Sequence, residues 1–254
     1  MILAVDIGNT NIVLGGFEER EILFRERIST NRIATDLEYM TYFKTALEMH
    51  GMKVSDIKGA IISSVVPSVT ATAKQAIHKL AGVTAMTVGP GVKTGLSIMI
   101  DNPATLGADL AVDAAAAISQ YKPPMIIIDM GTATTMSVVD KNKNYIGGVI
   151  MTGMAVSSEA LTTRTSQLPR IAFEAPRKVI GTNTVDCMKS GLMYSTASSL
   201  DGMIDRIEEE LSDKCTVIAT GGLAHMIVPL CKRDIILDED LLLKGLMVIY
   251  NKNN

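Results

Sequence analysis

Cysteine, histidine and aromatic residues are scarce in this sequence of 254 residues, which has no tryptophan and only 4% aromatic residues. The three cysteines, Cys187, Cys215 and Cys231, show no CxxC spacing. A disulfide framework or a zinc site is therefore not indicated, and buried thiols are the better interpretation. The three histidines are scattered, with no HxxxH pair and no Ser/His/Asp order. A hydrolase built on such residues is not supported.

An excess of charge and a long apolar run are also missing. The chain has 24 Lys+Arg against 27 Asp+Glu, a formal net charge of −3. This balance argues against a nucleic-acid partner but not against one phosphorylated small molecule. The start of the chain, MILAVDIGNT, has no basic region typical of a signal peptide, and no apolar run approaches the ~18–20 residues of a membrane span. We therefore expect a cytoplasmic protein with no membrane partner.

Strand-like and helix-like stretches alternate along the first half of the chain. Residues 2–7 are almost entirely apolar, as in a buried central strand, and strands over 12–17 and 22–28 would complete a meander around the charged turn EERE. The segment Thr35-Asp36-Leu37-Glu38 has the form of a capping box and begins a helix that ends before Gly51. The pattern then predicts a strand at 59–67, a helix over 70–81 and an Ala-rich helix from about 104 to 121.

The pattern restarts after Pro123-Pro124. Residues 125–140 predict two strands around a tight turn, and 145–151 predict a third. A helix over 201–212, a strand at 216–220 and a last helix over 241–250 follow.

Two similar turns suggest that one unit occurs twice. Asp6-Ile7-Gly8-Asn9-Thr10 and Asp129-Met130-Gly131-Thr132-Ala133 both follow a buried strand and begin 123 residues apart, close to half of the chain. The same order of elements follows each turn, which indicates an internal duplication. We therefore predict two α/β domains with mixed sheets flanked by helices, over residues 1–120 and 121–254.

A strand that ends in D-x-G-[NT]-T suits phosphate binding. Glycine allows the turn to approach a ligand closely, and backbone N–H groups with Asn and Thr side chains can donate to phosphate oxygens. The carboxylate at the strand end would hold a metal or its water opposite the phosphates. Each turn alone is equally typical of an ordinary hairpin, but their pairing favours phosphate binding. The pair Gly221-Gly222 could admit an adenosine or could be a plain turn.

These turns, in this order, resemble the phosphate and adenosine motifs of the acetate and sugar kinase/Hsp70/actin superfamily. The middle of the chain is similar to type III pantothenate kinases, and so is the start, Asp6 to Asn11. The segments that carry this closer resemblance are Thr94-Gly95-Leu96, Asn102-Pro103, Gly107-Ala108-Asp109, Asp129 to Thr135, Gly147-Gly148 and Gly153. The resemblance covers the whole chain and implies two actin-like (ribonuclease H-like) domains and phosphorylation of pantothenate by ATP, the first step of coenzyme A synthesis.

The resemblance also implies a role for particular residues. Asp109 would be the base that accepts the proton of the pantothenate hydroxyl, and Asp129 would bind the monovalent cation, K⁺ or NH₄⁺, with Mg²⁺ accompanying ATP. Thr132 and one continuous loop would bind ATP. That loop consists of Asp6, Ile7, Gly8, Asn9, Thr10, Asn11, Ile12 and Val13. The pantothenate site would be formed by Ile100, Gly107, Ala108, Asp109, Leu110 and Thr184. Family members are homodimers with this pocket at the interface, so a homodimer is expected.

Three positions depart from the pattern of the family, all in the expected pantothenate pocket. Ile100 stands where the family usually has tyrosine, Leu110 where it has arginine, and Asp113 where it has asparagine. Replacing arginine by leucine removes a cation and a fork of donors from a site for a carboxylate substrate. A kinase for another small alcohol and a non-catalytic nucleotide-binding protein therefore stay open beside the pantothenate kinase. Thr184 could also be the N-cap of the helix that follows, which is compatible with binding the substrate. Residues 155–178 could be a lid, an interface loop or a surface connection.

Overall fold

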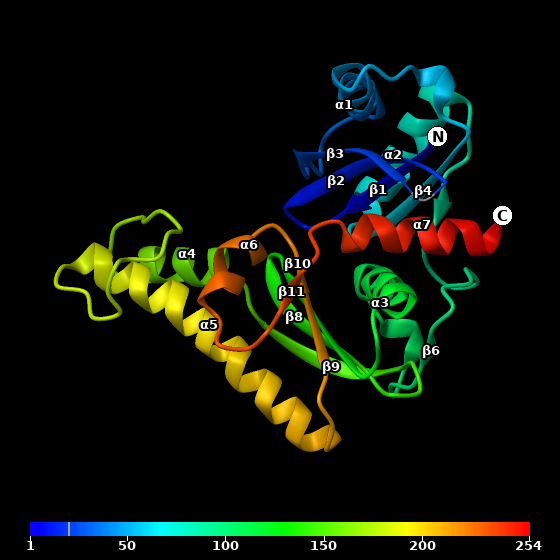
Figure 1. Cartoon of the computed structure of the whole chain (residues 1–254). Helices are drawn as coiled ribbons and strands as arrows, with labels where there is room; N and C mark the ends of the chain where they lie inside the picture. The colour runs from blue at the N-terminus through cyan, green and yellow to red at the C-terminus, as the bar shows by residue number, and fades with distance from the viewer. Residues whose placement is uncertain (20) are drawn as a thin grey trace. The chain divides into compact units, whose positions relative to one another are not determined.

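The computed structural model describes residues 1–19 and 21–254 and contains two mixed sheets flanked by helices (Figure 1). By its contacts the chain divides into two compact units. The first comprises Met1–Leu96, Asp101–Ser119 and Asp240–Asn254, and the second comprises Ser97–Ile100 and Gln120–Glu239. The units therefore differ from the predicted halves in residues 97–100, 120 and 240–254. A division at residue 120 into separately folding domains stays a prediction.

The sheet of the first unit has five strands in the order β3-β2-β1-β4-β5. They are β1 (Ile2–Ile7), β2 (Asn11–Glu18), β3 (Glu21–Ser29), β4 (Gly59–Ser64) and β5 (Met86–Thr87). Strand β1 pairs antiparallel with β2 and parallel with β4, so it is central and, apart from Asp6, its residues are apolar on both faces. The predicted meander is confirmed, although Arg20 in its second turn lies outside the described residues.

Different helices cover the two faces of this sheet (Figure 1). Leu3, Val5 and Ile7 pack in one core with α1 (Asp36–Met49) and α2 (Pro67–Ala81). Ala4 packs in the other core with α3 (Ala108–Gln120) and α7 (Leu241–Asn253). Because strand side chains alternate between faces, Asp6 in β1 belongs to the face that α3 and α7 cover.

The predicted capping box of α1 is confirmed. The Thr35 side chain accepts from the Glu38 N–H, and the Glu38 carboxylate accepts from the Thr35 N–H at 2.7 Å. On the other face, Gly245 of α7 lies against the Val112 carbonyl of α3 so closely that a Cβ atom would collide with it. Glycine there lets the two helices touch through their backbones.

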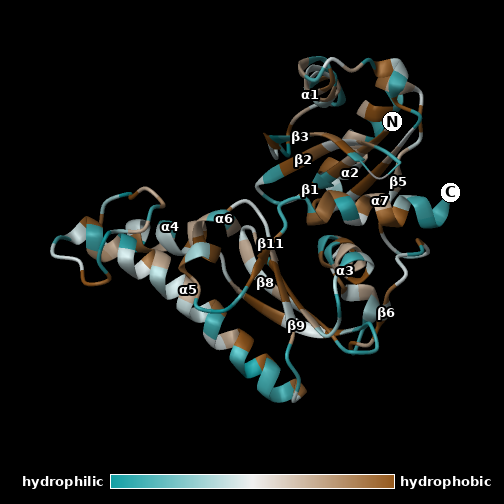
Figure 2. Ribbon diagram, viewed as in Figure 1, coloured by the Kyte–Doolittle hydropathy of each residue, from teal (hydrophilic) through white to brown (hydrophobic). Residues whose placement is uncertain are grey.

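The sheet of the second unit has six strands in the order β11-β10-β7-β8-β9-β6. They are β6 (Ser97–Ile98), β7 (Met125–Met130), β8 (Ala133–Val139), β9 (Asn144–Thr152), β10 (Thr216–Thr220) and β11 (Ile236–Leu237). The series β9-β8-β7-β10-β11 repeats the order and the strand directions of β3-β2-β1-β4-β5. The predicted duplication, and with it the fold class, is confirmed. The strands of both sheets are mostly hydrophobic (Figure 2).

Three α-helices accompany this sheet in the described part of the second unit. They are α4 (Met154–Arg164), α5 (Thr184–Leu211) and the short α6 (Ala224–Ile227). Residues 165–183, between α4 and α5, have neither helix nor strand and run beside the N-terminal part of α5. Tyr194 Oη of α5 donates to the Pro176 carbonyl at 3.1 Å, Ser190 Oγ donates to the Val179 carbonyl, and Lys189 pairs with Glu174. Residues 165–183 are thus an irregular segment between α4 and α5 that is attached to α5 by side-chain contacts.

Several predicted helix bounds need correction. Helix α3 begins at Ala108 rather than near 104, because a short 3₁₀ turn at Pro103–Thr105 and an extended Leu106 precede it. Helix α5 spans Thr184–Leu211, whereas the pattern predicted only 201–212. Its first half is rich in Ser and Thr, which weakens the apolar stripe. Helix α4 was not predicted, and it buries only Met154 and Ser158.

Within residues 1–19 and 21–254, no helix combines the length and the apolar character that a membrane span requires.

Candidate active site

The turn between β1 and β2 is a four-residue hairpin fastened to the end of β3. Ile7 pairs with Ile12, and the Gly8 N–H donates to the Asn11 carbonyl at 3.0 Å. Thr30 Oγ1 donates to the Gly8 carbonyl at 2.7 Å, and the Thr30 N–H donates to the Thr10 carbonyl at 2.9 Å. The backbone of the turn is therefore held, while the side chains of residues 9–11 are exposed. Such a turn can present N–H, amide and hydroxyl donors to an anion.

The turn between β7 and β8 is the counterpart of this hairpin and is one residue shorter. Met130 pairs with Thr134, and the Gly131 N–H donates to the Ala133 carbonyl at 3.0 Å. Gly153, which caps α4, lies close behind the turn, because a Cβ atom there would stand 2.7 Å from the Gly131 carbonyl. The side chain of Thr132 is exposed at the tip. Both predicted turns are therefore present, each within its own unit, and their binding of phosphate stays a prediction.

The strand-end carboxylates occupy equivalent positions in the two sheets. Asp6 lies one residue before the end of β1 and is buried, and Asp129 lies one residue before the end of β7 and is half-buried. Asp6 is paired with Val13 in β2 and with Ser63 in β4. Asp129 is paired with Thr135 in β8 and with Thr220 in β10. Hydroxyl-bearing residues therefore lie beside both carboxylates.

Gly221 brings backbone directly against Asp129. Its φ is +94°, and a Cβ atom at this position would lie 2.5 Å from Asp129 Oδ1 and from the Met130 nitrogen. Any side chain would both strain the backbone and displace the carboxylate. Glycine at position 221 therefore allows the backbone after β10 to lie against Asp129, a constraint that a plain strand-to-helix turn does not have.

Asp109 lies in the first turn of α3, beside Gly107. A Cβ atom at Gly107 would collide with Asp109 Oδ1, so this glycine makes room for the carboxylate. Burial raises the pKa of Asp109, and the Leu110 N–H, which donates to Oδ1 at 2.9 Å, only partly opposes this rise. A carboxylate with a raised pKa is a stronger proton acceptor once it is ionised. The first turn of a helix also favours negative charge.

Asp113 follows Asp109 by one turn of α3 and is only 1% exposed. Both of its carboxylate oxygens are shielded from solvent. The neighbouring positions Ala108 and Leu110 are half-buried. The chain therefore has an additional carboxylate inside the core of the first unit, close in sequence to the expected base.

The residues expected to bind pantothenate are divided between the units. Gly107, Ala108, Asp109 and Leu110 belong to the first unit, whereas Ile100 and Thr184 belong to the second. Thr184 is exposed at the first residue of α5. The alternative that Thr184 is the N-cap is wrong, because Asn183 is the cap and its side chain accepts from the Asp186 N–H at 2.9 Å. The Thr184 side chain is thus not used as the cap of the helix.

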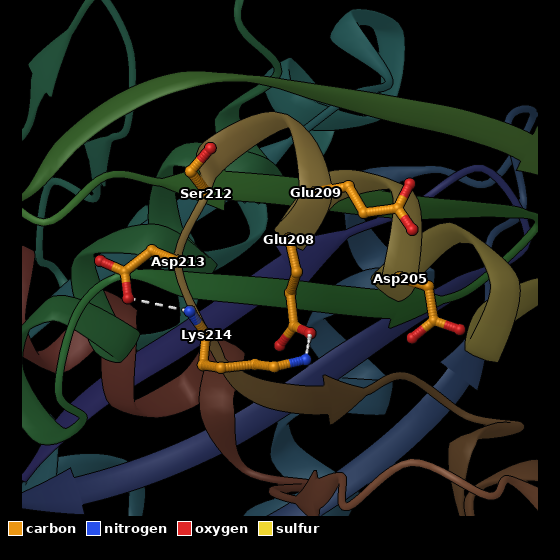
Figure 3. A pocket seen from close by; sticks show the side chains of 6 residues that line it. All are labelled: Asp205, Glu208, Glu209, Ser212, Asp213 and Lys214. Atoms are coloured by element: carbon orange, nitrogen blue, oxygen red, sulfur yellow. Dashed lines mark hydrogen bonds and ion pairs between the residues drawn. The ribbon is translucent and has the colours of Figure 1, made fainter.

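A hollow of about 440 Å³ lies at the C-terminal end of α5 (Figure 3). It is lined by Asp205, Glu208, Glu209, Ser212, Asp213 and Lys214. Glu208 points toward Lys214 and accepts from Lys214 Nζ at 2.6 Å (Figure 3). Four carboxylates around one lysine repel phosphate, so this hollow is not the nucleotide site.

Residues 1–19 and 21–254 contain no cluster of three or more His, Cys, Asp or Glu that could hold a metal ion.

Comparison with known proteins identifies the family. The sequence profile of type III pantothenate kinases matches residues 2–206. A type III pantothenate kinase of Halalkalibacterium halodurans is 44% identical over 253 residues, which is 100% of both chains. One from Bacillus cytotoxicus is 43% identical over 100% of this chain and 97% of its own. The chain belongs to the type III pantothenate kinase family. The resemblance in the sequence is thereby confirmed.

Solved structures of more distant proteins share the fold. The activator of 2-hydroxyisocaproyl-CoA dehydratase from Clostridium difficile, solved with bound ADPNP, has a TM-score of 0.58 at 15% identity and covers 98% of this chain and 93% of its own. Component A of (R)-2-hydroxyglutaryl-CoA dehydratase from Acidaminococcus fermentans has a TM-score of 0.58 at 14% identity, covering 98% and 96%. At these identities the likeness concerns the fold alone.

Two features of the site were not predicted from the sequence. One is the collision that any side chain at Gly221 would make with Asp129, and the other is the hydroxyl beside each strand-end aspartate. The only sequence signal for the second was that the strand after each helix ends in small residues, Ser63-Ser64 in the first half. Which residue stands opposite an aspartate depends on strand register, which that signal does not contain.

Proposed function

We propose that this protein transfers the γ-phosphoryl group of ATP to pantothenate and forms 4′-phosphopantothenate, the first step of coenzyme A biosynthesis. The observation that carries the proposal is the full-length relative, 44% identical, named a type III pantothenate kinase. The family profile over residues 2–206 supports it. A divergent relative with another acceptor, or with no catalysis, is not favoured by these comparisons.

ATP is held, in this proposal, by the two hairpin turns. Residues Asp6 to Val13 bind its phosphates through N–H groups and the exposed side chains of Asn9, Thr10 and Asn11, and Thr132 donates from the second turn. The fastening of the first turn by Thr30 supports this role, because donors that are already in place bind an anion without further ordering. Mg²⁺ accompanies ATP, and its charge neutralises the phosphates. The Asp6 carboxylate at the end of β1, which is buried, would hold that cation or its water.

Asp109 acts as the base in the transfer. The pantothenate hydroxyl oxygen forms a bond to the γ-phosphorus, the bond from that phosphorus to the bridging oxygen breaks, and ADP keeps the electron pair. The hydroxyl proton passes to the Asp109 carboxylate. The raised pKa of Asp109 and its place in the first turn of α3 support this assignment.

Asp129 holds a monovalent cation, K⁺ or NH₄⁺, in this proposal. The oxygen donors beside it fit such an ion, because they are its own carboxylate and the hydroxyl of Thr135, the register partner of Asp129. Oxygen donors suit hard cations. A bound cation would supply positive charge near the phosphates of ATP.

Pantothenate is the proposed acceptor, bound by Ile100, Gly107, Ala108, Leu110 and Thr184 together with the base. The exposure of Thr184 at the start of α5 supports its availability to a ligand. Leu110 brings no charge to the substrate carboxylate. We therefore expect weaker binding of pantothenate than an arginine at this position would give.

A homodimer with the pocket at its interface completes the proposal. Helix α4, the segment 165–183 and the start of α5 expose several large apolar side chains, which soluble monomers rarely gather in one place. They are Val156, Leu161, Val179, Ile180 and Val185. Light scattering after gel filtration should give the mass of a dimer, and Ile180→Asp should shift it toward the monomer. Because the reaction consumes ATP, we place the protein in the cytoplasm.

The test is ADP release and detection of 4′-phosphopantothenate by mass spectrometry, with ATP, Mg²⁺ and K⁺, with and without pantothenate. Pantothenate-dependent turnover that disappears in Asp109→Asn supports the proposal. Asp234→Asn, an exposed aspartate outside the site, is the matched control and should keep the activity of the unchanged protein. Equal turnover in Asp109→Asn would remove that residue from its role as base.

A further inference from the structure

Ser63, near the end of β4, has a buried hydroxyl without a partner. The residue is 0% exposed, and its Oγ makes no hydrogen bond with any group in residues 1–19 and 21–254. A buried polar group that makes no hydrogen bond destabilises the fold. Alanine would fill the same space without this cost, so the hydroxyl requires an explanation beyond packing.

The position of Ser63 in the sheet places it beside Asp6. The two residues are register partners in the parallel strands β1 and β4, whose backbones lie ~4.8 Å apart. Register partners project from the same face of a sheet. For Asp6 and Ser63 this is the face covered by α3, the helix that carries Asp109. Asp6 itself is only 9% exposed.

The second unit repeats this arrangement. Thr135 Oγ1 is buried, has no partner among the described residues, and is the register partner of Asp129 in the antiparallel pair β7–β8. A third such hydroxyl, that of Thr87 in β5, is paired with Ile62 and has no aspartate beside it. Of the three buried hydroxyls without partners in the described part of the chain, two therefore lie beside the strand-end carboxylates of the two turns.

We propose that Ser63 is a positioning residue for Asp6. When MgATP is bound, the Ser63 hydroxyl donates to the Asp6 carboxylate and fixes which of its oxygens faces the nucleotide. In the protein without nucleotide that hydrogen bond is not made, and the buried Ser63 hydroxyl then destabilises the folded state. This inference rests on the proposed role of Asp6 in the ATP site. The role of Ser63, near the end of β4, is thus to orient the negative charge of Asp6.

The experiment compares Ser63→Ala with Thr87→Val, which removes the control hydroxyl. Both variants should raise the Tm of the protein without nucleotide, because each deletes a buried group that lacks a partner. Only Ser63→Ala should lower kcat/KM for MgATP, by about 10- to 100-fold, the effect of losing a hydrogen bond to a charged group. It should also raise the Mg²⁺ concentration needed for half-maximal ATP binding in calorimetry without pantothenate. Ser63→Thr, which retains the hydroxyl, should restore most of both values.

The result that overturns the inference is a Ser63→Ala protein with a higher Tm and unchanged kcat/KM and Mg²⁺ dependence. In that case Ser63 only fills space. Asp6→Asn separates this failure from failure of the proposed ATP site. If Asp6→Asn loses MgATP binding while Ser63→Ala does not, only the positioning role fails. If Asp6→Asn binds MgATP normally, the role of Asp6 fails, and with it the inference.

Discussion

Glu208, near the C-terminal end of α5, offers the sharpest test of stability in the second unit. It is 5% exposed and accepts from Lys214 Nζ and Arg233 Nη2, both at 2.6 Å, and from the Cys215 N–H at 3.0 Å. Burial raises the pKa of Glu208, but these hydrogen bonds outweigh burial and lower the pKa to about 2. The bonds join α5 to the start of β10 and to the segment before β11.

The magnitude follows from this pKa. A fall from the ordinary 4.5 to about 2 is about 2.5 pH units, which at ~1.36 kcal/mol per unit is ~3.4 kcal/mol of folding free energy. The Lys214 side chain is 81% exposed, so solvent screens its part. We therefore expect Glu208→Gln to cost about 2–3 kcal/mol, or about 4–10 °C in Tm.

The same pKa fixes the pH dependence. The carboxylate is more acidic in the folded chain than in the unfolded chain, so its stabilisation is complete above about pH 5 and is lost as the pH falls toward 2. At pH 4 the difference between the unchanged protein and Glu208→Gln should be about a quarter smaller than at pH 7.

Urea unfolding followed by circular dichroism at both pH values measures these differences. Glu209→Gln is the matched control, since Glu209 is the next residue of α5, lines the same hollow and is exposed (Figure 3). It should change stability by less than about 0.5 kcal/mol. Equal effects of the two substitutions, or a Glu208→Gln effect that does not shrink at pH 4, would refute the reasoning.

Three further predictions concern the candidate site. Asp109→Asn should raise Tm at pH 7, because burial raises the pKa of Asp109 and its ionised form destabilises the fold; the gain should vanish in thermal melts at a pH below the ordinary aspartate value. Gly221→Ala should lower the free energy of unfolding in urea by about 1–3 kcal/mol, because the φ is +94° and a Cβ would collide with Asp129. The control is Gly191→Ala in the interior of α5, where a Cβ meets nothing within 4 Å, and it should be neutral or stabilising by up to ~1 kcal/mol. Leu110→Arg should lower the KM for pantothenate in the ADP-release assay and leave the KM for ATP unchanged; an unchanged pantothenate KM would show that Leu110 does not contact the acceptor.

Local patterns were sufficient for much of the fold. The apolar run of β1, the capping box of α1 and the glycine turns after Asp6 and Asp129 depend on a few neighbouring residues, and the structure has all of them. The duplication was visible in the sequence because the same series of strands and helices follows each turn. The strands of that series also take the same positions in the two sheets. The start of α3 and the first half of α5 were misplaced, since a 3₁₀ turn and a Ser/Thr-rich helix blur apolar periodicity.

The sequence by itself indicated the family and the two glycine turns, because these are carried by short local motifs. The candidate base followed from the resemblance to the family. Only the tertiary structure decided which residues stand beside the strand-end carboxylates. Strand register placed Ser63 against Asp6 and Thr135 against Asp129, and the packing of β10 against β7 put the backbone of Gly221 next to Asp129. Packing also gave α7 to the first unit, where Gly245 meets Val112. Apart from the hairpin pair Asp129 and Thr135, these contacts join residues far apart in the chain, and no local pattern encodes them.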